Sequence, residues 1–110
     1  MSYYLYQLSY SAEATKAMVA KPSDRKAAAT KLMEAAGCKL HHLFFAFGNT
    51  DVYCLVEAPN DLAMMAAAAA VGASGTVSRA KTTKLFTAEE AMTALTMAGK
   101  VIGAYRSPMA

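Results

Sequence analysis

The chain has 110 residues, of which 55% are hydrophobic and 17% are charged, and its formal net charge is +3. This length fits one domain with a modest core, and the scattered lysines and arginines form none of the basic stripes typical of nucleic-acid-binding surfaces. The apolar run at 62–73 is too short to cross a bilayer, which takes about 20 residues. We therefore expect neither nucleic acid nor a membrane as partner.

The N-terminus and the cysteines indicate the compartment. The first ten residues, MSYYLYQLSY, lack the basic start and the long apolar run of a signal peptide. The chain holds two cysteines, Cys38 and Cys54. We therefore expect a cytoplasmic protein in which both thiols stay reduced.

The balance of apolar and charged residues indicates an oligomer. The charged fraction is below the usual value of roughly a quarter, although much of the apolar excess is alanine. A small domain with more apolar residues than its core can hold commonly buries the rest in a subunit interface. We expect the chain to be its own partner, in a homodimer or a higher homo-oligomer.

The first third of the chain predicts a strand and a helix. Residues 2–10 are rich in tyrosine and leucine, which favours a strand. A loop or short helical turn then ends at Pro22. A helix is expected from Asp24, with Pro22 or Ser23 near its cap, and Gly37 supplies its C-terminal stop.

The middle of the chain predicts a hairpin and a second helix. Strands are expected at 38–47 and 51–58, and the turn between them contains Gly48, which tolerates positive φ. Pro59 ends the second of these strands. A helix is then expected over 61–75.

The last third of the chain predicts one more strand and helix. Asn60 or Asp61 is expected to cap the helix over 61–75. A fourth strand is expected at 76–87. Thr87 and Glu90 form a capping box. It opens a final helix over 88–103.

This order of elements predicts the fold class. It is the βαββαβ order of ferredoxin-like α+β domains, followed by a C-terminal helix. Right-handed crossovers make the first two strands parallel, with the third strand between them. Both internal helices then cover one face of the sheet and leave the other face bare. We expect a single domain over 1–110, with its core ending near residue 97 and a tail at 98–110.

Period-two alternation divides the third strand into two faces. One set is small and apolar, suits burial beneath alanine-rich helices, and consists of Val52, Cys54, Val56 and Ala58. The other set is larger and mixed in polarity, and consists of Asp51, Tyr53, Leu55 and Glu57.

The hairpin register decides which residues of the second strand share the bare face. The simplest register makes three pairs: Phe47 with Asp51, Phe45 with Tyr53, and His41 with Glu57. It places an aromatic surface on the bare face, and a partner sheet packed face to face would cover it. A shift of one residue would instead place His42 opposite Glu57.

The segment FGNTDVYCLVEAPND at 47–61 is similar to the signature of the GYD-domain family. The matching residues are Gly48, Asp51, Val56, Glu57, Ala58 and Pro59, and Thr50 stands where the family has its tyrosine. The resemblance extends over most of the chain. It implies the wider dimeric α+β barrel group, in which two ferredoxin-like sheets face each other. That group includes cofactor-free monooxygenases, isomerases, dehydratases and haem-binding proteins.

Three residues are candidates for proton transfer: His41, Glu57 and Asp51. Either carboxyl could act as a base if burial raises its pKa; the competing interpretation makes Asp51 a turn residue and Glu57 an interface group. His41 and His42 point to opposite faces of a strand, so they cannot chelate one metal together. His41 shares the aromatic face and is the better base or metal ligand, unless it is only an interface histidine.

Aromatic and basic residues are candidates for holding a ligand. Those on the first strand and on the aromatic face are Tyr4, Tyr6, Tyr10, Tyr53 and Phe45, and interface packing would also account for them. Arg79 and Lys81 share one face of the fourth strand and would hold an anion. Otherwise they protect an edge strand with their charge.

The sequence favours a small-molecule site, either between the sheet and the helices or between two sheets. We expect it to take a small apolar or aromatic ligand. In one version the protein is a cofactor-free enzyme in which His41 or Glu57 moves a proton. The alternatives are a non-catalytic sensor or scaffold oligomer, and a metal or haem binder through His41. The first two versions need no cofactor and no metal.

Overall fold

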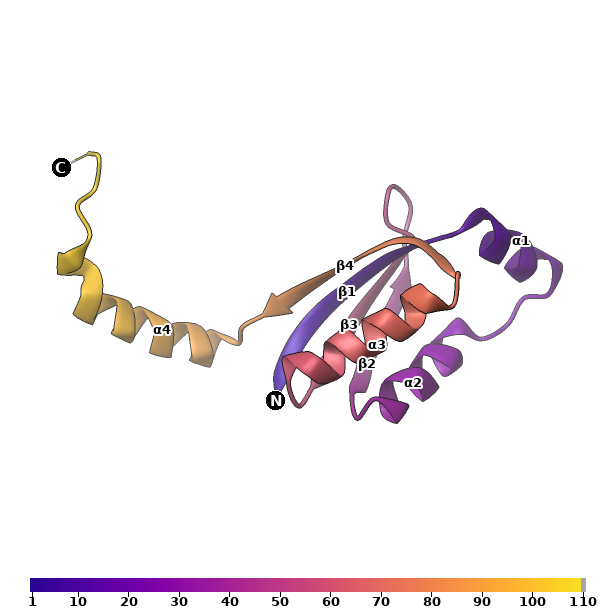
Figure 1. The fold of residues 1–110 in the computed structure, drawn as a ribbon, viewed down its shortest axis with the longest axis horizontal. Helices are drawn as coiled ribbons and strands as arrows, with labels where there is room; N and C mark the ends of the chain where they lie inside the picture. The colour runs from indigo at the N-terminus through magenta and orange to yellow at the C-terminus, as the bar shows by residue number, and fades with distance from the viewer. Residues whose placement is uncertain (110) are drawn as a thin grey trace.

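The computed structural model describes residues 1–109 and contains one four-stranded sheet with helices on one side (Figure 1). The strands are β1 (Ser2–Tyr10), β2 (Lys39–Phe45), β3 (Val52–Ala58) and β4 (Val77–Leu85). The helices are α1 (Ala12–Ala20), α2 (Arg25–Ala35), α3 (Asp61–Ala73), α4 (Ala88–Val101) and the short 3₁₀ helix η1 (Ile102–Ala104). The α+β class and the four predicted strands are confirmed.

The order of strands across the sheet is β2-β3-β1-β4. Both β1 and β2 run antiparallel to β3, so they are parallel to each other with β3 between them, as predicted. Helices α2 and α3 lie on the same face of the sheet (Figure 1). The opposite face, which we call the open face, has no helix over it within residues 1–109.

Side-chain caps define where the helices begin. Ser11, Asp24, Asn60 and Thr87 each accept a hydrogen bond from a backbone N–H in the first turn of the following helix. Two predictions need correction. The segment after β1 is a complete helix, α1, and the cap of α2 is Asp24. An aspartate carboxylate is a strong N-cap acceptor, and here it lies within reach of the Ala27 N–H at 3.0 Å.

The core lies between the sheet and the two covering helices. Alternate residues of β3 face the helices and are fully buried: Val52, Cys54, Val56 and Ala58. Their neighbours on β1 are Tyr4, Tyr6 and Leu8. Met33 of α2 and Met64 of α3 close the core from above. This confirms the predicted division of the third strand into two faces.

The predicted hairpin register is wrong by one residue. Phe45 lies opposite Val52 and Phe44 lies opposite Tyr53, because the connection between the strands takes up residues 46–51 and is closed by a hydrogen bond from the Ala46 N–H to the Asp51 carbonyl. Since paired residues share a face, Phe45 lies on the helix side and Phe44 on the open face. Phe47 lies in the connecting loop and is fully exposed.

A bulge in β2 restores part of the predicted arrangement. The register shifts between Leu40 and His42, so His41 is the extra residue. The side chain of His41 reaches Glu57 even though Lys39 is the residue paired with Glu57 across the strands. The predicted His41–Glu57 proximity is therefore confirmed, by a bulge instead of a regular pairing.

Helix α4 stands apart from the rest of the molecule. It continues away from the end of β4 and leads away from the sheet (Figure 1). The structure measures 60 × 31 × 21 Å, with a radius of gyration of 18.0 Å, whereas a compact chain of this length has about 13 Å. None of the helices within residues 1–109 combines the length and apolar character needed to cross a membrane.

Candidate functional site

A cavity of ≈260 Å³ lies between the sheet and helices α2 and α3. Its walls are apolar: β1 contributes Leu8, β2 Leu43, β3 Val52, and the helices Leu32, Met33 and Val71. Both helices carry alanine where they face the cavity, at Ala28, Ala29 and Ala70. These small side chains leave a gap between the helices and the sheet. Small side chains on the helices therefore leave room for a small molecule above the sheet.

Five polar side chains line this cavity: Tyr6 and Tyr10 of β1, Arg25 of α2, and Ser74 and Thr76 between α3 and β4. The hydroxyl of Tyr6 and the Nε of Arg25 are buried and have no hydrogen-bond partner within residues 1–109. Buried polar atoms without a partner are uncommon in folded proteins. Arg25 is also the one charged residue that the described part of the chain contributes to the lining. The cavity is thus mainly apolar, with unsatisfied hydrogen-bonding groups and one positive charge.

The two tyrosines of the cavity stay protonated at neutral pH. Burial raises the pKa of the Tyr6 phenol. Burial also raises the pKa of Tyr10, and the neighbouring positive charge of Arg25 offsets part of this rise. A protonated phenol donates a hydrogen bond, so both tyrosines are suited to an acceptor atom on a ligand.

Cys54 lies on the floor of the same cavity. Burial raises the pKa of its thiol to about 11. A nucleophilic cysteine needs a thiolate and hence a lowered pKa. Cys54 therefore acts as part of the apolar floor.

The predicted catalytic pair lies on the open face, away from this cavity. The Nε2 atom of His41 is 2.9 Å from Oε1 of Glu57, and both side chains are partly buried. The ring of Tyr3 lies 5.6 Å from the His41 ring. A histidine that hydrogen bonds to a carboxylate has one ring nitrogen fixed and the other free to exchange a proton with a substrate.

Asp51 is not part of this pair. Its carboxylate accepts a hydrogen bond from the Tyr10 N–H at 2.9 Å, and its own N–H donates to the Leu8 carbonyl at 2.9 Å. It lies just before the first residue of β3, whereas Glu57 lies near the last. Asp51 therefore ties the hairpin loop to β1, which is the turn interpretation of this residue.

Arg79 and Lys81 lie on the open face, as neighbours of Ser9 and Gln7 on β1. The Nη2 atom of Arg79 donates to the Asn49 carbonyl at 2.8 Å. A shallow hollow of ≈160 Å³ lies beside the two basic residues. Their shared face is confirmed, and this basic hollow is at the opposite end of the open face from the His41–Glu57 pair.

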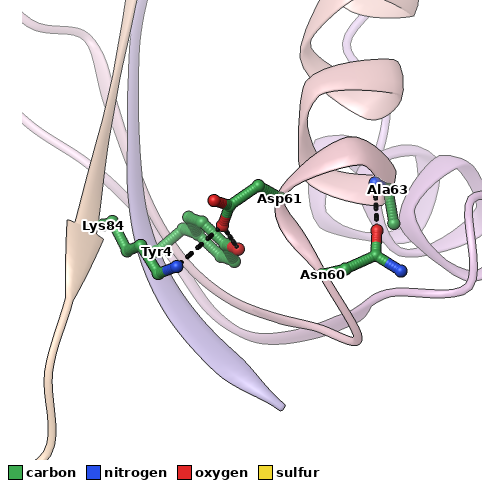
Figure 2. A network of polar contacts seen from close by, with 5 residues as sticks. All are labelled: Tyr4, Asn60, Asp61, Ala63 and Lys84. Carbon is green, nitrogen blue, oxygen red and sulfur yellow. Dashed lines mark hydrogen bonds and ion pairs between the residues drawn. The ribbon is translucent and has the colours of Figure 1, made fainter.

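Tyr4 belongs to a third group of polar contacts, shown in Figure 2. Its hydroxyl donates to Oδ1 of Asp61 at 2.5 Å, and Nζ of Lys84 lies 3.0 Å from the same oxygen. The three residues come from β1, α3 and β4. They join the first turn of α3 to the sheet, so Tyr4 is a structural tyrosine and does not line the cavity.

The structure divides the predicted ligand-binding residues between two sites. Tyr6 lines the helix-side cavity and Phe45 stacks on Tyr10 at its edge, with ring centroids 6.1 Å apart. Tyr53, Arg79 and Lys81 lie on the open face.

Arg25 was not among the predicted site residues, although a signal was present. Arg25 lies three, four and seven positions before Ala28, Ala29 and Leu32, which is the spacing of one helix face. Arg25 therefore shares a helix face with these apolar residues, and that face of α2 lines the cavity.

The comparison with known proteins agrees with this fold. The sequence profile of the GYD domain matches residues 4–95, which cover all four strands and most of α4. The chain belongs to the GYD domain family. No curated protein and no solved structure matches it. Within residues 1–109 of this GYD-domain protein, no three His, Cys, Asp or Glu side chains are grouped so that they could hold a metal ion.

Proposed function

We propose that this GYD-domain protein binds a small apolar or aromatic carboxylate in the cavity between the sheet and helices α2 and α3. The observation that carries the proposal is the pair of buried polar atoms without a partner within residues 1–109, Tyr6 Oη and Arg25 Nε, at a mainly apolar cavity. A guanidinium matches a carboxylate in geometry and charge. The apolar walls then hold the remainder of the ligand.

The size of the cavity limits the ligand. Pockets for drug-sized molecules are about 300–1,000 Å³, and this one is ≈260 Å³. A single ring or a short branched chain with one carboxylate fits that volume. A haem or a dinucleotide does not.

Binding of benzoate and benzamide by isothermal titration calorimetry tests the proposal, because the two have nearly the same shape and differ in charge. We expect benzoate to bind at least about tenfold more tightly, since a hydrogen bond to a charged group contributes about 1.5–3 kcal/mol. Arg25→Gln should remove this preference. Lys26→Gln removes the same charge from the adjacent, exposed position and should leave it intact. Equal binding of benzoate by both variants would refute the role of Arg25.

The same proposal includes a homo-oligomer in the reducing cytoplasm, in which a second copy covers the open face. Support comes from the large apolar side chains there, which no helix covers within residues 1–109: Leu5, Phe44, Tyr53, Leu55 and Leu85. Two such sheets packed face to face give the dimeric α+β barrel that the family resemblance implies. Sedimentation velocity across a dilution series tests this, and a single subunit at every concentration would exclude it.

A second candidate function is proton transfer by His41 on the open face. The observation that favours it is the 2.9 Å contact between His41 and Glu57 beside Tyr3. In this version a second copy excludes water from the pair and so makes a site between two sheets. The test is a screen for cofactor-free isomerase or dehydratase turnover, in which His41→Gln should abolish turnover while the oligomer persists. Turnover that survives in His41→Gln would exclude this residue as the base.

A further inference from the structure

Helix α4 has an apolar side that nothing covers within residues 1–109. The α4 stripe, as we call it, comprises Phe86, Ala91, Ala94, Leu95 and Ala98, which border one hollow. Leu95 is 72% exposed, and none of the residues of α4 is buried. Isolated helices shorter than about 12–15 residues are marginal in water. A 14-residue helix with such a stripe needs a surface to pack on.

Helix α4 leads away from its own sheet after a connection of two residues from β4 (Figure 1). Strand β4 ends at Leu85, and Thr87 caps α4 through a capping box with Glu90, so Phe86 is the single residue between strand and cap. The connection from β3 to α3 has the same length, and α3 turns back over the sheet. In contrast, α4 extends beyond the end of β4 and does not turn back over the sheet (Figure 1).

The chain also carries a groove without an occupant, beside its edge strand. A hollow of ≈290 Å³ lies between α3 and β4, and Met64, Met65, Ala68 and Thr82 are among its walls. Strand β4 is the edge of the sheet, and its helix-side residue Thr82 is exposed. Met65 is 70% exposed beside it. We call this the α3–β4 groove.

The groove and the stripe match in length and in the size of their side chains. Helix α4 has 14 residues and α3 has 13, so the two have nearly equal lengths of about 20 Å at 1.5 Å per residue. The alanines of the stripe allow α4 to approach Ala68 and Thr82 closely. Lys84 and Asp61 also line the groove and pair with each other at 3.0 Å, so the match rests on length and on small side chains.

We infer that α4 is an exchanged arm, which lies in the α3–β4 groove of a second copy while the α4 of that copy fills the first groove. The exchange is self-complementary, as a two-fold symmetric dimer requires. It leaves the open faces free to meet each other. It is independent of any ligand in the helix-side cavity.

Cross-linking between two variants of the full chain, each with one added cysteine, tests the exchange. One variant carries Met65→Cys in the groove and the other Leu95→Cys in the stripe, so a mixed disulfide can form only between copies. The two native cysteines are buried and give little background. We expect the mixed pair to predominate under mild oxidation, and to exceed by at least about tenfold the pair made by Leu95→Cys with Val19→Cys, an exposed site on α1.

Other outcomes overturn the inference. Predominant Leu95→Cys homodimers would mean that α4 pairs with α4. A double variant that closes its own bridge within a monomer would mean that α4 turns back onto its own groove. An associated protein that forms no mixed bridge would mean that the arm lies elsewhere.

A charge placed on the stripe provides a second measurement. Leu95→Lys should weaken self-association at least about tenfold by sedimentation velocity, because it buries an unpaired charge in the groove. Met97→Lys is the matched control, since Met97 is 62% exposed and lies outside the stripe. Equal weakening by both, or by neither, would contradict the exchange.

Discussion

The Tyr4 hydroxyl donates a 2.5 Å hydrogen bond to the carboxylate of Asp61, and Lys84 lies 3.0 Å from the same oxygen (Figure 2). The bond from Tyr4, and then that from Lys84, lower the pKa of Asp61. The same contact raises the pKa of Tyr4, and its partner Asp61 raises the pKa of Lys84. A single carboxylate at the start of α3 thus joins that helix to β1 and to β4.

The lowered pKa of Asp61 predicts how stability depends on acid. The carboxylate form is favoured in the folded state, so its stabilisation is complete above the unfolded pKa of about 3.9. It is lost as the pH falls through the folded value. We expect Asp61→Asn to reduce the difference in urea midpoint between pH 7 and pH 2.5. Glu34→Gln, at an exposed position of α2, should leave that difference unchanged, and the same change in both variants would refute the role of Asp61.

Burial of Cys54 predicts a thiol that is inert in the folded protein. Its pKa is raised to about 11, so the thiol contributes stability that is complete below the unfolded pKa of about 8.5 and is lost as the pH rises through about 11. We expect neither Cys54 nor Cys38 to react with a thiol reagent at pH 8 until urea unfolds the chain. Val19→Cys, at a position that is 77% exposed on α1, serves as the exposed reference thiol, and native cysteines that react as fast as this reference would contradict the prediction.

Local patterns account for the parts of the fold that the sequence predicts correctly. The alternation of β3 and the capping box at Thr87 and Glu90 involve residues a few positions apart, and each requires only one kind of local geometry. Gly37 likewise ends α2 with a φ of +79°, a value that favours glycine. Such features do not depend on contacts with distant parts of the chain.

The incorrect predictions concern features that depend on contacts between distant segments of the chain. Asp51 is held by the backbone of Leu8 and Tyr10, so β1 sets the length of the hairpin loop and with it the register of β2. The bulge at His41 then depends on that register. Similarly, the amphipathic pattern of α4 shows that it needs a partner surface, but no pattern within the helix shows which surface that is.

Burial at the centre of β3 predicts the cost of removing volume from the core. Val56 is completely buried, so Val56→Ala should lower the free energy of unfolding by about 2 kcal/mol, from lost methyl transfer and the cavity left behind. Val19 on α1 is 77% exposed, and Val19→Ala should change the free energy of unfolding by less than about 0.5 kcal/mol. Urea unfolding of both variants measures the difference. Equal values would place Val56 outside the core.

The corrected register predicts different effects for two adjacent phenylalanines. Phe44 lies on the open face opposite Tyr53, whereas Phe45 lies on the helix side and stacks on Tyr10. If a second copy covers the open face, Phe44→Ser should weaken self-association at least about tenfold and leave the unfolding of the subunit unchanged. Phe45→Ser should instead lower the free energy of unfolding by about 1 kcal/mol, because it removes an aromatic contact, without changing the oligomer.

Sedimentation velocity and urea unfolding of the two variants separate these effects, and each variant is the control for the other. The opposite pattern, with Phe45→Ser dissociating the oligomer, would support the register in which Phe45 faces Tyr53. That register would also move Leu43 from the cavity wall to the interface. The measurement therefore decides which side of β2 belongs to the ligand cavity and which to the second copy.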